Sequence, residues 1–175
     1  MEYYATITNG IIDGKGQCPC SGDNTFSVEV TKEVYDNLEQ YVWTGSELIL
    51  NPEWDNIQLN KAKDEKIKLN DELRDRALLQ GVEYQNVLFD SDTDQKVNLL
   101  ATVGMMSDSD TITWYGMDNK GLLCTKADLI AIGGLITELH SFCWGNNAYI
   151  KEQIANAQTM EELEAIEINY NREEV

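Results

Sequence analysis

The fold is decided by residues 125–157, which read TKADLIAIGGLITELHSFCWGNNAYIKEQIANA. Thr125 and Asp128 have the spacing of a capping box, in which side chains bind the free amides at the start of a helix. Gly133-Gly134 and Gly145 weaken helix formation locally, but the apolar periodicity continues past them. We therefore expect one long helix that ends near Ala157. Its buried stripe would consist of Leu129, Ile132, Ile136, Leu139, Cys143, Ile150 and Ile154.

Shorter elements are expected on both sides of this helix within residues 81–175. Gly81 is expected to end the preceding helix, because glycine readily adopts the left-handed conformation found just after helices. Thr159 repeats the capping-box pattern and predicts the start of a last helix. The expected elements are hairpins at residues 82–89 and 111–124, a helix over residues 92–106 and a short final helix that reaches residue 166.

Residues 61–80 form a compositional break between two acidic regions. They carry six basic and five acidic side chains, with the two signs interleaved. Opposite charges three or four residues apart stabilise a solvent-exposed helix, so a helix is predicted from about Asn60 to Gln80. Its second half gains apolar residues and is expected to dock, while the first half projects as a charged linker. The same helix offers a route to a homo-oligomer.

Residues 1–60 have the pattern of a small β-rich lobe. Residues 3–8 and 26–30 are rich in β-branched and aromatic residues, which favours strands, and Asn9-Gly10 predicts a tight hairpin turn. Thr31 is expected to cap a short helix, and a second hairpin is expected to follow. The predicted fold class is α+β, with a small β-rich N-terminal lobe (residues 1–60), a charged linker helix (residues 61–80) and a helical C-terminal domain with two β-hairpins and one long helix (residues 81–175).

The net charge limits the possible partners. The 175 residues include 13 Lys and Arg against 31 Asp and Glu, a formal net charge of −18. An acidic surface repels phosphate backbones and anionic lipid headgroups, so neither nucleic acid nor a membrane is an expected partner. No apolar run approaches the roughly 20 residues of a spanning helix, and Met1-Glu2-Tyr3-Tyr4 lacks the character of a secretory signal. We expect a soluble protein.

Four residues raise the question of a metal site. Cys18 and Cys20 stand in a Gly-rich turn, and His140 and Cys143 lie three residues apart on the predicted long helix. That spacing would let the helical pair face one zinc ion. The CxC spacing is tighter than in most structural zinc sites, and the two pairs are far apart in sequence. A reduced turn together with a buried thiol is the preferred interpretation, and metal binding by the four residues stays open.

The sequence contains no pattern that predicts catalysis or a cofactor. The acidic run at residues 90–94 resembles a calcium loop, but Gln95 and Ala101 occupy the positions that need Gly and Glu. Asp92 or Asp94 is instead expected to cap the following helix. His140 is the only histidine, and its place in an apolar helix favours a packed or interface residue. Neither a catalytic residue nor a cofactor is therefore predicted.

The four tryptophans are the candidate partner-binding residues. Large aromatic side chains dominate the energetics of cores and interfaces. Because no enzymatic motif is present, we expect these residues to act as core and interface anchors. They are Trp43, Trp54, Trp114 and Trp144.

An ordered series of motifs runs from about residue 73 to residue 168. In chain order it comprises Arg74 and Arg76, Gly81-Val82-Glu83-Tyr84, Phe89-Asp90-Ser91-Asp92 with Gln95, Trp114, Asp118-Asn119, Thr125 with Ala127 and Asp128, His140, and residues 154–166. This series resembles a small-domain family of unknown biochemical function that recurs in bacteriophage tail-fibre and tail-fibre-assembly proteins. Residues 30–35, VTKEVY, followed by Asn51-Pro52, are similar to N-terminal lobes of Gram-positive phage tail and baseplate accessory proteins.

The resemblance implies a phage protein that works through protein contacts and not as an enzyme. It would bind a tail-fibre or baseplate protein and assist its assembly or attachment as a chaperone, in the host cytoplasm during phage assembly. Two alternatives stay open. The chain would be a permanent component of the baseplate or fibre in the virion tail, with the residue 61–80 helix self-associating. It would otherwise be a host-surface, carbohydrate-binding module that uses the N-terminal aromatic residues.

Overall fold

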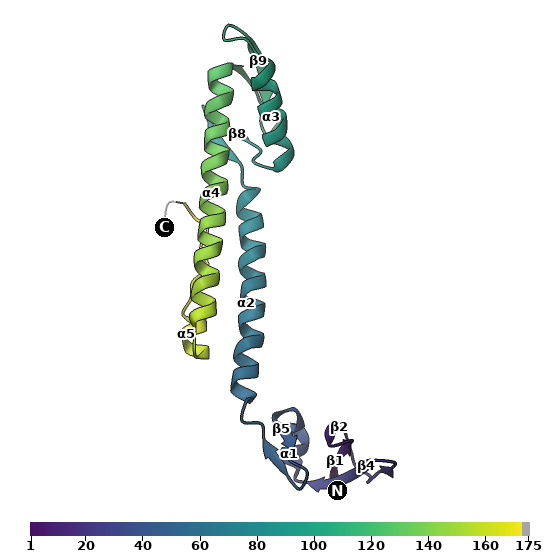
Figure 1. Cartoon of the computed structure of the whole chain (residues 1–175). Helices are drawn as coiled ribbons and strands as arrows, with labels where there is room; N and C mark the ends of the chain where they lie inside the picture. The colour runs from purple at the N-terminus through teal and green to yellow at the C-terminus, as the bar shows by residue number, and fades with distance from the viewer. Residues whose placement is uncertain (173–175) are drawn as a thin grey trace. The chain divides into compact units, whose positions relative to one another are not determined.

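The structure is a computed structural model that describes residues 1–172 (Figure 1). Contacts divide the chain into two compact units, Met1–Asn60 and Lys61–Val175. Strands dominate the first unit, while helices and small antiparallel hairpins build the second. The α+β fold class predicted from the sequence is confirmed. Within residues 1–172, the helices are too short or too polar to cross a lipid bilayer.

The first unit contains a four-stranded antiparallel sheet with the order β2-β1-β4-β3. The central strand β1 buries Ala5 and Ile7 completely. Asn9 and Gly10 both have positive φ, 53° and 79°, which lets a two-residue turn join β1 to β2 as predicted. The strands are β1 (Tyr3–Thr8), β2 (Ile11–Gly16), β3 (Ser21–Gly22) and β4 (Thr25–Val30).

A short helix and a hairpin follow the sheet. The Thr31 hydroxyl accepts the Val34 amide at 3.2 Å and caps the helix, as predicted. The expected second hairpin is also present. The elements are α1 (Lys32–Asp36), the 3-10 turn η1 (Leu38–Gln40), β5 (Tyr41–Trp43) and β6 (Leu48–Leu50).

Helix α2 (Trp54–Leu78) starts earlier than the predicted boundary near Asn60. The backbone of Asn51 accepts the Trp54 amide at 2.9 Å, and its side chain accepts the Glu53 amide at 3.0 Å. Pro52 lies inside this turn, where a residue without an amide hydrogen is tolerated. The proline that ends the preceding hairpin therefore also starts the helix, and the unit boundary falls within α2.

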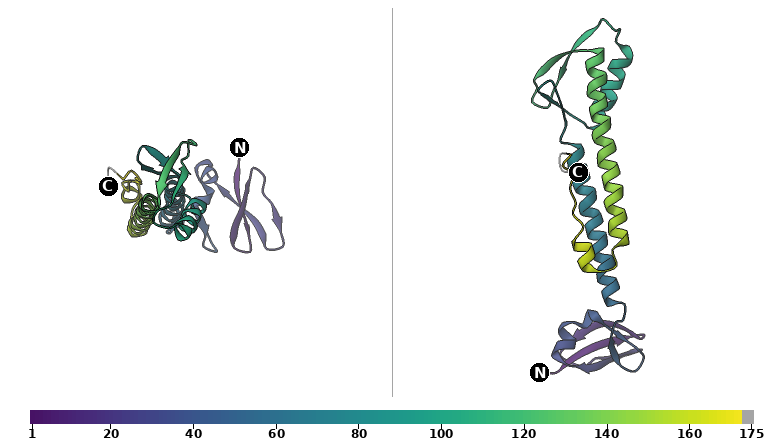
Figure 2. Two further views of the ribbon diagram at one scale, coloured as in Figure 1. Left: turned by 90° about the horizontal axis from the view of Figure 1, so that it is seen from above. Right: turned by 90° about the vertical axis from the view of Figure 1, so that its left-hand side faces the viewer.

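The second unit is organised around α4 (Lys126–Asn156), which is the long helix predicted from the sequence. Its glycines do not interrupt it. Within this unit α2 and α4 run side by side in opposite directions (Figures 1 and 2). The fully buried apolar side chains of α4 include Leu129, Ile132, Ile136, Cys143 and Ile154.

Smaller elements complete the second unit. Asp92 accepts the Gln95 amide at 2.7 Å and caps α3, which confirms the helix-cap interpretation of the acidic run. Gly81 has a φ of 80° and follows α2, as predicted. The remaining elements are β7 (Val82–Tyr84), β8 (Val87–Phe89), α3 (Thr93–Met105), β9 (Thr111–Tyr115), β10 (Gly121–Thr125) and α5 (Met160–Glu164).

The residues expected to project as a linker are anchored within the second unit. Lys63 Nζ donates to the Ala155 carbonyl at 3.0 Å, in the last turn of α4. Lys66 Nζ donates to the Leu163 carbonyl at 2.7 Å, in α5. A cation is favourable at a helix C-terminus, where carbonyls lack partners and the helix dipole is negative. The charge pattern predicted that this part of α2 would be exposed to solvent. In the structure, Lys63 and Lys66 instead hold α2 against the C-terminal ends of α4 and α5.

Candidate functional site

The four tryptophans do not form one surface patch within either unit. Trp43 on β5 packs edge-on against the Phe26 ring, with centroids 5.5 Å apart, and Trp54 opens α2. Both are half-buried parts of the first unit. Trp114 and Trp144 belong to the second unit. Trp114 lies on β9, which precedes α4, and Trp144 lies about 27 Å along α4 from its first residue.

Trp144 has the most exposed side chain of the four. It is 53% exposed, and the Arg74 guanidinium lies 4.2 Å from its ring centroid. This cation–π contact joins α2 to α4. Trp114 is half-buried and borders a shallow hollow of about 510 Å³ between α3 and β9. Polar side chains also line this hollow. The predicted role of all four residues in partner binding stays a prediction.

An apolar groove lies between α3 and α4. Its volume is about 530 Å³, and we call it the α3–α4 groove. Leu100 is 64% exposed and Ile130 is 56% exposed. Aliphatic side chains left in water in this way mark a candidate contact surface. The groove is lined by Lys96, Leu99, Leu100, Val103, Ile130, Gly133, Gly134, Ile136, Thr137 and Glu138.

Two adjacent glycines of α4 form this groove. A Cβ on Gly133 would lie 3.0 Å from Leu99 Cδ2, so the missing side chain allows α3 to approach closely. A Cβ on Gly134 would meet no atom within 4 Å, so this position leaves open space. Sequence reasoning interpreted the Gly133-Gly134 pair only as a weak point of the helix. The groove could have been predicted from α3, whose sequence places apolar residues such as Leu99 and Leu100 on more than one face of the helix.

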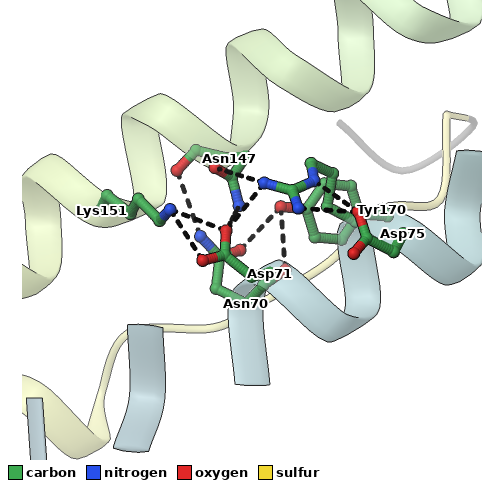
Figure 3. A network of polar contacts seen from close by, with 7 residues as sticks. Asn70, Asp71, Asp75, Asn147, Lys151 and Tyr170 are labelled. Atoms are coloured by element: carbon green, nitrogen blue, oxygen red, sulfur yellow. Dashed lines mark hydrogen bonds and ion pairs between the residues drawn. The ribbon is translucent and has the colours of Figure 1, made fainter. Parts of the chain in front are cut away.

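A polar layer joins α2, α4 and the segment after α5 (Figure 3). Asp71 Oδ1 accepts Arg74 Nη1 at 2.8 Å and Asn147 Nδ2 at 3.0 Å. Lys151 Nζ lies 2.7 Å and 2.9 Å from the two carboxylate oxygens of Asp71. The contact to Lys151, opposed by partial burial and reinforced by Asn147, lowers the pKa of Asp71 below its ordinary value.

Tyr170 connects the C-terminal segment to the same layer. Its hydroxyl donates to Asn70 Oδ1 at 2.7 Å, and Asn70 Nδ2 donates to the Asn147 carbonyl at 3.1 Å. Asn70 is fully buried, and burial also raises the pKa of Tyr170. Among residues 1–172, no buried side-chain nitrogen or oxygen lacks a hydrogen-bond partner. This layer therefore fixes the position of three segments. It also explains why Asn147 occurs on the otherwise apolar buried face of α4.

The residues considered for a metal site lie in different surroundings. Cys18 and Cys20 are exposed in the first unit, whereas Cys143 is buried in α4 of the second. His140 Nε2 lies 2.8 Å from the Ser91 carbonyl. Burial raises the pKa of the Cys143 thiol, which disfavours the thiolate that binds metals. Within the part of the chain that the structure describes, no three His, Cys, Asp or Glu residues are grouped so that they could hold a metal ion.

Comparison with known proteins gives one match, to a family. Searches of curated proteins and of solved structures returned no match. Residues 61–169 match a family described as a domain of unknown function, DUF4376. The match covers more than half of the chain and includes α2 from Lys61 onward, the α3–α4 groove and the polar layer. The chain therefore belongs to the DUF4376 family.

Proposed function

We propose that this chain is a non-enzymatic bacteriophage tail protein that binds a tail-fibre or other distal tail polypeptide and assists its assembly or attachment. It would act in the host cytoplasm while tails are assembled. The motif series of residues 73–168 resembles domains of tail-fibre and tail-fibre-assembly proteins, which supports the phage context. The α3–α4 groove supports a mode of action through protein contacts.

The groove is the observation that carries the proposal. Leu100 and Ile130 leave most of their surface in water, whereas other apolar residues of the same two helices are buried. Covering such surface with a partner is favourable by roughly 25 cal/mol per Å² of apolar area. The net charge of −18 keeps a chain with an exposed apolar groove soluble until a partner arrives.

Affinity capture during infection tests the proposal. A tagged chain is expressed in host cells infected by the phage that carries its gene, and captured proteins are identified by mass spectrometry. We expect a tail-fibre or baseplate polypeptide to be enriched with the wild type. Gly134→Leu, which fills the groove, should abolish this enrichment. Gly145→Leu is the matched control, because Gly145 also lies on α4 and a Cβ added there would meet no atom within 4 Å.

Mass spectrometry of purified virions separates the two roles. An assembly factor is absent from finished particles, whereas a permanent component of the baseplate or fibre is present in a fixed ratio to other tail proteins. Capture of no tail polypeptide by the wild-type chain would overturn the proposal.

A further inference from the structure

We infer that the α3–α4 groove binds an amphipathic helix of the partner polypeptide whose apolar face is flanked by basic residues. This inference rests on the proposed function and specifies the chemistry of the partner. The reasons are the dimensions of the groove, the kind of elements that form its walls and the charges around it.

The dimensions of the groove match one face of a helix. Its α3 wall runs from Lys96 to Val103 and its α4 wall from Ile130 to Glu138, which correspond to about 11 and 12 Å of helix. Residues i, i+4 and i+7 of a docked helix span about 10.5 Å, so the groove accepts three apolar side chains of such a face. Gly134 provides the hollow for the central side chain.

The walls of the groove favour a helix over a strand. An extended peptide gains most of its affinity from hydrogen bonds to a free sheet edge. Both walls here are helices, α3 and α4, which lie side by side (Figures 1 and 2). Their backbone groups are used within the helices, so the groove offers contacts between side chains. A third helix packed against two others is the arrangement that such contacts allow.

The surrounding charges favour a basic occupant. Asp92 and Asp94 lie at the start of α3, and the Glu138 side chain is 66% exposed and lies 3.5 Å from the Arg172 guanidinium. Among the lining residues, Lys96 is the one cation and Glu138 the one anion, so the excess of negative charge comes from Asp92, Asp94 and the rest of the chain. The net charge of −18 adds a long-range attraction for cations. The same charge opposes a second copy of this chain, because two such acidic molecules repel each other.

Peptide binding tests the inference on the full chain. The probe is a fluorescent helical peptide of about 18 residues with leucines at i, i+4 and i+7 spacing and lysine flanks. A sister peptide carries glutamates in place of the lysines. By fluorescence anisotropy we expect the lysine peptide to bind at least about tenfold more tightly than the sister peptide, and to weaken as salt rises.

Groove variants separate specific docking from general attraction of cations to an acidic protein. Gly134→Leu should weaken binding of the lysine peptide by about tenfold or more, while Gly145→Leu leaves it unchanged. Leu100→Glu adds negative charge, so general attraction would strengthen binding, whereas docking in the groove requires that binding weakens. Leu79→Glu makes the same charge change at a leucine of similar exposure outside the groove, 61% against 64%, and should not weaken binding.

Several results would overturn the inference. They are equal binding of both peptides, unchanged binding by Gly134→Leu, or stronger binding by Leu100→Glu in variants whose circular dichroism and thermal midpoint match a folded chain. A dimer in light scattering that Gly134→Leu dissociates would assign the groove to a second copy.

If tail proteins are captured but the lysine peptide does not bind, this inference fails and the proposed function stands. If the peptide binds but no tail protein is captured, the proposed function fails.

Discussion

Asp71 is the residue on which the contacts of the polar layer converge. Its carboxylate receives donors from Arg74, Asn147 and Lys151 at 2.7 to 3.0 Å. These groups belong to two helices that are far apart in sequence. Replacing Asp71 with a neutral residue would leave Lys151 without its carboxylate partner and Arg74 with Asp75 alone, and loss of one partner of a partly buried ion pair is unfavourable. This carboxylate is therefore one of the contacts that hold α2 against α4.

The pH dependence of stability tests this role of Asp71. Its pKa is lowered in the folded state, so its contribution is complete above its unfolded pKa of about 4 and is lost as the pH falls through the lower folded value. We expect the urea midpoint of the wild type to exceed that of Asp71→Asn at pH 7, and the gap to shrink below about pH 4. A gap that stays constant from pH 7 to pH 3 would contradict this assignment.

Gly81 is required by its conformation and by its surroundings. It has a φ of 80°, and a Cβ there would lie 2.6 Å from the Phe89 carbonyl oxygen and 2.9 Å from Met117 Sδ. We expect Gly81→Ala to lower the free energy of unfolding by about 2 kcal/mol or more, measured by urea denaturation. Gly145→Ala is the control, because this open helical position should gain about 0.5–1 kcal/mol. Equal effects of the two substitutions would refute the steric argument.

At the scale of elements, the start of α4 connects three parts of the second unit. Thr125 Oγ1 accepts the Asp128 amide at 3.2 Å, and Asp128 Oδ2 accepts the Thr125 amide at 2.8 Å, which forms the predicted capping box. Tyr84 on β7 donates to Asp128 Oδ1 at 2.7 Å. Lys126 Nζ donates to the Met106 carbonyl at 2.9 Å, just after α3. The helix cap thus also holds the β7–β8 hairpin and the end of α3.

A double-mutant cycle at this cap tests the connection. Thr125→Ala should lower the free energy of unfolding by about 1 kcal/mol through loss of the cap. Asp128→Ala should lower it more, because the Tyr84 hydroxyl also loses its acceptor. We expect Tyr84→Phe and Asp128→Ala to be coupled in urea denaturation. Strict additivity of the two substitutions would show that the hairpin is not held by this carboxylate.

At the scale of the whole molecule, charge determines how the chain behaves in solution. The outward face of α2 within residues 61–78 is charged, and Leu69 is the one large apolar residue there that is exposed among the described positions. The inward face is already used by contacts to α4, α5 and the segment that carries Tyr170. Little apolar surface on this helix is therefore left for pairing with a second copy.

Light scattering tests the alternative of self-association through the residue 61–80 helix. With a net charge of −18 and a charged outer face on α2, the isolated protein should have the mass of one chain, 19.8 kDa, at moderate salt. A dimer that Leu69→Glu dissociates would support the alternative of a helix-paired structural component.

Many local features could be predicted because neighbouring residues determine them. The Asn9-Gly10 turn, the caps at Thr31, Asp92 and Thr125, and the glycine that follows α2 all depend on groups within a few positions of each other. The early start of α2 was missed, because a proline compatible with both the end of a hairpin and the first turn of a helix does not decide between them.

The sequence by itself determined the α+β class, the long helix and most turns, since propensity, capping and periodicity act along the chain. Only the tertiary structure decided that Lys63 and Lys66 bind helix ends, that Asn147 belongs to a hydrogen-bonded layer, and that Gly134 opens a groove. Each of these depends on which faces of α2, α3 and α4 meet. That choice depends on contacts between residues far apart in sequence, which a local pattern does not contain.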